Sequence, residues 1–92
     1  MAVLSAFSQN LNQKITIKAH DEPLGEIIKQ ISEKSNILFS YNPQSIPLTK
    51  KITVNARNVP VSEIFEIVFT ANGIEYKIAE KQVILKLSKQ ES

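Results

Sequence analysis

The fold is decided by Lys14-Ile-Thr-Ile-Lys-Ala-His-Asp-Glu-Pro-Leu-Gly-Glu-Ile27, which the chain repeats as Lys51-Ile-Thr-Val-Asn-Ala-Arg-Asn-Val-Pro-Val-Ser-Glu-Ile64. The offset from position 14 to position 51 is 37 residues and holds without a gap, and Ile37 matches Ile74 further on. Lys, Ile, Thr, Ala, Pro and Glu recur at matching positions. Agreement at one fixed offset indicates two copies of a single supersecondary unit.

The first copy predicts a strand, a helix and a second strand. Apolar and polar residues alternate from Lys14 to Ala19, as in a strand with one covered face. Pro23 suits the first turn of a helix, which Asp21 or Glu22 is expected to cap. Apolar residues at helical spacing then occupy only about 100° of the helix surface: Leu24, Ile27, Ile28 and Ile31. The helix is expected to end at Asn36, before a strand at 37–41.

The second copy predicts the same order with a more apolar helix. Residues 52–56 repeat the alternating strand. The helix from about 60 to 72 carries apolar side chains over an arc of about 200°, which indicates that it is covered on two sides. Gly73 is expected to end this helix, and strands at 74–78 and 82–87 follow.

The expected fold is therefore α+β, with two βαβ repeats plus a terminal strand and with two helices sandwiched between two small sheets. The domain spans 14–87, with repeat 1 at about 14–41 and repeat 2 at about 51–87. Residues 1–13 are expected to form a disordered tail, and residues 88–92 a linker.

The N-terminal sequence also carries an indication of export. Ala2 to Gln9 is apolar and rich in small residues, and it resembles the end of a bacterial signal peptide. This stretch is too short for a membrane span, so no complete targeting or transmembrane segment is expected.

Composition argues against several function classes. The absence of cysteine excludes disulfides and thiolate chemistry. The net charge is only +2 and Arg57 is the single arginine, so neither nucleic acid nor an anionic membrane is expected as a partner. The chain also lacks the glycine-rich phosphate loop and the GxxG loop of KH-type RNA binders.

No residues show the spacing of a catalytic, metal or cofactor site. His20 lies beside Asp21 and Glu22, but three adjacent residues on a turn rarely surround one ion. Glu26 and Glu63 are equivalent in the repeat and are expected to stabilise the two helix N-termini by about 0.3–1 kcal/mol each, with a catalytic pair as the alternative. We therefore expect neither enzymatic activity nor a cofactor.

Protein–protein contact is the activity that these exclusions leave, and two surfaces are candidates for it. Ile67 and Phe69 flank the wide apolar arc of the second helix. Packing in the core is the favoured interpretation for both, with an exposed patch for a partner as the alternative. Val83, Ile84 and Leu85 are consecutive apolar residues. If they form an edge strand, their free backbone groups would accept a partner strand. A strand covered on both faces is the alternative.

Several motifs together resemble the secretin and TonB N-terminal (STN) domain from Lys14 to Leu87. They are Pro23-Leu-x-Glu-x-Ile-x-x-Ile-Ser-x-x-Ser-Asn-Ile-x-Phe-x-Tyr41, Lys51-Ile-Thr-Val54 and Val59-Pro-Val-x-Glu-Ile-Phe-x-x-Val-Phe-x-x-Asn-Gly-Ile-x-Tyr76. The resemblance rests on the order of the repeats, their spacing and the ending Gly73-Ile-Glu-Tyr76.

The resemblance implies a periplasmic domain of an outer-membrane protein that works by protein–protein contact. In TonB-dependent receptors such a domain precedes the plug and barrel and reports ligand occupancy to the periplasmic domain of an inner-membrane anti-sigma regulator. The implied partners are that regulator and the receptor's own plug and barrel. The domain itself is expected to be a monomer in isolation and not to insert into the membrane.

Two alternatives stay open, namely the ring-forming N-terminal domain of a secretin and the related periplasmic domain of an anti-sigma regulator. A signal-peptide remnant ahead of Lys14 favours a receptor or a secretin. By analogy, a receptor for nutrient uptake is the favoured interpretation.

Overall fold

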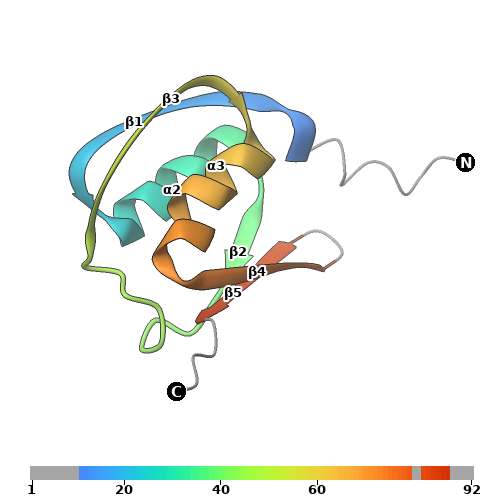
Figure 1. The fold of residues 1–92 in the computed structure, drawn as a ribbon. Helices are drawn as coiled ribbons and strands as arrows, with labels where there is room; N and C mark the ends of the chain where they lie inside the picture. The colour runs from blue at the N-terminus through green and yellow to red at the C-terminus, as the bar shows by residue number, and fades with distance from the viewer. Residues whose placement is uncertain (1–10, 80–81, 88–92) are drawn as a thin grey trace, which may run out of the picture.

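The computed structural model describes residues 11–79 and 82–87, and it places two helices between two small sheets (Figure 1). The elements are β1 (Lys14–Pro23), α2 (Leu24–Ser35), β2 (Leu38–Ser40), β3 (Lys51–Pro60), α3 (Val61–Val68), the 3₁₀ helix η1 (Thr70–Asn72), β4 (Ile74–Ala79) and β5 (Gln82–Leu87). This arrangement confirms the predicted α+β fold. The proposed signal-peptide remnant at 2–9 and the linker at 88–92 lie outside the described residues.

β1 and β3 form a two-stranded antiparallel ribbon that arches over both helices (Figure 1). Each strand has ten residues and buries its second, fourth and sixth side chains against the helices. Lys18 pairs with Asn55, which is its own equivalent in the repeat, so a pseudo-two-fold axis passes through this pair. The repeat in the sequence is therefore a symmetry of the ribbon.

The ribbon has an irregularity near each end, and the repeat relates the two. Asp21 has a φ of 54° and Asn58 a φ of 53°, a left-handed conformation that Asp, Asn and Gly tolerate best. The backbone N–H of Asp21 donates to Thr53 Oγ1 at 2.9 Å, and that of Asn58 donates to Thr16 Oγ1 at 3.0 Å. Each threonine thus accepts a hydrogen bond from the bulge of the other strand.

The first helix begins without a side-chain cap. Pro23 is the N-cap residue, and the N–H of Leu24 donates to the carbonyl of Lys50 at 2.9 Å. The prediction that Asp21 or Glu22 caps this helix is wrong, because both residues belong to β1 and a loop carbonyl takes the place of the carboxylate. The loop therefore fixes the entry of the chain into α2.

Both helical segments end as predicted, in left-handed residues. Asn36 follows α2 with a φ of 63°, and Gly73 follows η1 with a φ of 74°. The helix predicted at 60–72 is divided, because α3 ends at Val68 and η1 continues the path. Its apolar arc is also narrower than predicted, since Ile67 is 45% exposed.

The second sheet has the strand order β2-β5-β4, with β2 parallel and β4 antiparallel to β5. β5 is thus the central strand, and the prediction that Val83, Ile84 and Leu85 form an edge is wrong. Val83 and Leu85 are buried and Ile84 is half-buried, as expected for a central strand that packs on the core. The strand predicted at 37–41 is shorter, and β2 supplies one edge of this sheet.

The core lies between the two sheets, and the described residues of the expected tail contact it. Leu11 packs against the core, while Gln13 Nε2 donates to the carbonyl of Ser35 at 2.9 Å. The carbonyl of Gln13 accepts a hydrogen bond from the N–H of Val61 at 2.9 Å, at the start of α3. Residues 11–13 therefore belong to the packed part. Among the described residues, no helix combines the length and the apolar character needed to cross a membrane.

Candidate interaction surfaces

Ile67 and Phe69, the two candidates for an exposed patch, occupy different environments. Phe69 is fully buried, and its ring centroid lies 5.8 Å from that of Phe39 and 5.2 Å from that of Phe65. Core packing, the favoured interpretation, is confirmed for Phe69, because this residue follows Phe65 by four positions and so shares its buried face. Ile67 points away from that face and is exposed, so only Ile67 remains available to a partner.

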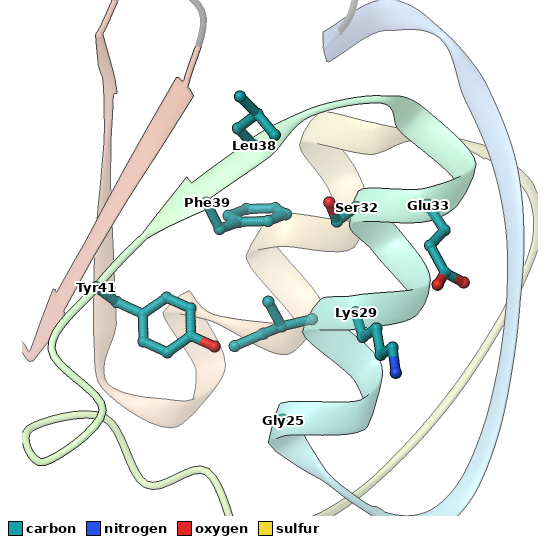
Figure 2. A pocket seen from close by; sticks show the side chains of 8 residues that line it. Gly25, Lys29, Ser32, Glu33, Leu38, Phe39 and Tyr41 are labelled. Carbon is teal, nitrogen blue, oxygen red and sulfur yellow. The ribbon is translucent and has the colours of Figure 1, made fainter.

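A groove of about 450 Å³ separates α2 from the β2 edge. Ile28 and Ser32 line it from the helix, and Leu38, Phe39 and Tyr41 line it from the other side. Figure 2 shows the rings of Phe39 and Tyr41 turned toward α2. Leu38 is 63% exposed at this groove, so the β2 edge presents apolar surface to solvent.

Hydroxyl groups at the end of α2 shape the groove. Ser32 Oγ donates to the carbonyl of Ile37 at 2.8 Å, and Ser35 Oγ accepts from the N–H of Ile37 at 3.3 Å. Ser35 Oγ in turn donates to the carbonyl of Ile31 at 2.6 Å. The helix thus satisfies both backbone groups of Ile37, and this contact sets where β2 begins.

The charged residues considered for chemistry stay apart. Glu26 and Glu63 are exposed in the first turns of α2 and α3, at the start of different helices. His20 is exposed on the ribbon, and no group of three or more His, Asp or Glu among the described residues could hold a metal ion.

One ionisable side chain has a perturbed environment. The hydroxyl of Tyr76 on β4 donates to Glu66 Oε2 on α3 at 3.0 Å. Burial raises the pKa of the Tyr76 phenol above its ordinary value of 10.0, and the neighbouring carboxylate raises it further. This pair links α3 to the three-stranded sheet and lies outside the groove.

The outer face of the ribbon is a second surface, which the sequence analysis did not single out. A shallow groove of about 460 Å³ runs across the pseudo-two-fold axis, with Lys18 and Arg57 among its lining residues and Glu22 also in contact with it. The signal was present in the sequence, because the residues that alternate with the buried ones on both strands include Lys14, Lys18, Lys51 and Arg57.

The family model described as the secretin and TonB N terminus short domain matches residues 37–88. The chain belongs to this family. The match begins just before β2 and covers the second repeat, so the STN domain includes the three-stranded sheet and α3.

A solved structure shares the fold of this STN domain. It is the crystal structure of a protein from Parabacteroides distasonis that is proposed to be an anti-sigma factor, with a TM-score of 0.71 and 14% sequence identity. The match covers 83% of this chain and 35% of that chain. The STN domain therefore spans about a third of that protein's length, and at this identity the likeness is one of fold. No curated protein matches the sequence.

Proposed function

We propose that this STN domain is a periplasmic protein–protein interaction domain of a TonB-dependent outer-membrane receptor, where it relays ligand occupancy to an inner-membrane anti-sigma regulator. The family match over residues 37–88 carries the proposal, because the family is described by its place at the N-terminus of secretins and TonB-linked proteins. The fold shared with a protein proposed to be an anti-sigma factor supports a regulatory setting.

The domain would act by changing its availability to the regulator. Ligand bound outside the cell would free or reposition the domain relative to the receptor's own plug and barrel, and the regulator would bind one arrangement better than the other. In this role the domain is a monomer, it catalyses no reaction, and it contacts neither nucleic acid nor the membrane interior.

Exposed apolar side chains are the groups most able to supply affinity for the regulator. Leu38 at the α2–β2 groove and Ile67 on α3 are candidates, at 63% and 45% exposed. Ile78 on β4 and Leu87 on β5 are similarly exposed, at 42% and 46%. Full burial of such a side chain stabilises a complex by about 1.5–3 kcal/mol. Val83, Ile84 and Leu85 would contribute indirectly, by holding β2 and β4 in place.

A second candidate function follows from the solved structure. The STN domain could be the periplasmic domain of an anti-sigma regulator itself, because the fold occurs within a protein proposed to be an anti-sigma factor. The partner would then be the N-terminal domain of a receptor. A secretin domain, the third candidate, would instead form rings and so self-associate as its concentration rises.

An in-frame deletion of residues 14–87 from the parent protein tests the relay. The expected result is loss of ligand-dependent transcription of the receptor's operon, with ligand import retained as the internal control. Unchanged transcription would contradict the relay. Loss of import together with transcription would indicate a structural role in the receptor.

A further inference from the structure

The two halves of the ribbon's outer face have the same backbone and different charge. The repeat relates Lys14 to Lys51 and Arg57 to His20 across the pseudo-two-fold axis, while the related pair Lys18 and Asn55 lies on the axis itself. We use the name cationic half for Lys14 and Arg57 together with Lys18 at its boundary, and all three are exposed. The symmetric half carries Lys51 and His20 at the equivalent positions.

The bulges increase this difference. In the symmetric half the bulge brings Asp21 and Glu22 beside the strand end, whereas their equivalents beside the cationic half are Asn58 and Val59. No Asp or Glu occurs at positions 14–18 or 55–60. Glu26 and Glu63, in the first turns of α2 and α3, are related by the repeat, so they do not offset the difference in charge between the two halves. Lys14, Lys18 and Arg57 therefore lie on strand segments that carry no carboxylate.

We propose that the cationic half is the docking surface for an acidic, extended segment of the regulator's periplasmic domain. The identity of this partner rests on the proposed function. Lys14, Thr16 and Lys18 project from alternate positions of β1, so neighbouring positions on this face are about 6.6 Å apart. An extended segment with Asp or Glu at alternate positions has the same period. Its carboxylates would face Lys14 and Lys18 along the strand and Arg57 across it.

The charge of the whole chain favours a protein segment over larger anions. The net charge is +2, so the field at a distance is weak and would not attract nucleic acid or an anionic membrane. The three exposed cations act only on charges close to them, because salt screens exposed charges at longer distances. Ion pairs of this kind fix the register of a bound segment more than they add to its affinity. A short acidic segment fits the short distance over which these cations act and the small size of this surface.

An NMR titration of the ¹⁵N-labelled chain tests the surface directly. The probe is the capped peptide Glu-Thr-Glu-Thr-Glu, and the control peptide is Gln-Thr-Gln-Thr-Gln. We expect the amides of Thr16 and Asn58 to shift with the acidic peptide only, while the symmetry-related amides of Thr53 and Asp21 stay unchanged. Equal shifts at both bulges, or none at either, would overturn the proposal. So would vesicles of anionic lipid that broaden the Thr16 and Asn58 signals when the peptide does not shift them.

A triple variant, Lys14→Gln with Lys18→Gln and Arg57→Gln, separates this inference from the proposed function. Binding of the periplasmic domain of the regulator encoded beside the chain should weaken about tenfold at low salt, because three exposed ion pairs are lost. Lys51→Gln is the matched control and should bind as the wild type does. If the regulator binds the wild type and the triple variant equally, the surface is wrong and the proposed function stands. If it binds neither, the proposed function fails, and the peptide titration decides the surface alone.

Discussion

Asn58 donates its backbone N–H to the hydroxyl of Thr16, 3.0 Å away on the other strand of the ribbon. The 37-residue repeat reproduces this contact between Asp21 and Thr53. Each bulge is thus held by a threonine of the opposite strand, and both threonines belong to the motif that reveals the repeat. The matching Ile-Thr pairs in the sequence therefore supply core residues and fasten the ribbon at both ends.

Thr16→Val should destabilise the domain by about 0.5–1 kcal/mol, because valine keeps the branched shape and removes the acceptor of an exposed hydrogen bond. Thr53→Val should cost about the same, since the repeat makes the two sites equivalent. Urea unfolding measures both, with Thr49→Val in the exposed loop as a control that changes little. Two costs that differ by several-fold would contradict the equivalence of the bulges.

Asn58→Ala should destabilise the domain by about 1–2 kcal/mol, because alanine tolerates the left-handed backbone at φ 53° poorly. Asn58→Gly should stay within about 0.5 kcal/mol of the wild type, since glycine adopts this conformation freely. Thermal or chemical unfolding compares the two variants. Asn55→Ala, on the same strand with ordinary backbone, is the control, and an equal loss there would show that backbone conformation is not the cause.

Phe69→Ala should cost about 3–5 kcal/mol, because it leaves a cavity among the rings of Phe39 and Phe65. Ile67→Ala, two residues away, should change stability by less than about 0.5 kcal/mol because its side chain is exposed. Unfolding curves of the two variants test whether Phe69 packs in the core while Ile67 is exposed. A large loss for Ile67→Ala would contradict its availability to a partner.

Tyr76 should make stability fall at high pH. Its folded pKa is raised above 10.0 by burial and by Glu66, so folding favours the neutral phenol. This contribution is fully present below pH 10.0 and is lost as the pH rises through the raised pKa. The free energy of unfolding of the wild type should therefore decrease relative to Tyr76→Phe above about pH 10. A constant difference between the two proteins across that range would contradict the hydrogen bond to Glu66.

The sequence predicts most of the fold, because the repeat and the alternation of apolar and polar residues along the strands indicate which side chains are buried. The buried residues of β1 and the left-handed residues Asn36 and Gly73 follow from local patterns and are confirmed. The helix cap predicted at Asp21 or Glu22 is wrong because the carbonyl of Lys50, distant in sequence, occupies that place. Local pattern carries no information about such a partner.

The candidate surfaces could be predicted only in part. Ile67 was identified from the helical arc, but the same arc does not show that Phe69 packs beside Phe39, which comes from another strand. The position of β5 in its sheet also depends on a parallel pairing with β2, across more than 40 intervening residues. Strand order is a property of the assembled sheet, so an apolar run such as Val83 to Leu85 fits an edge and a centre equally well.

The most direct test of the account is a titration of the ¹⁵N-labelled domain with the periplasmic segment of the anti-sigma regulator that we propose as its partner. We predict saturable shifts confined to part of the domain's surface, and a domain that stays monomeric by sedimentation when the regulator is absent. An absence of shifts at high regulator concentration, together with self-association of the domain, would contradict the signalling role and favour a secretin-like one.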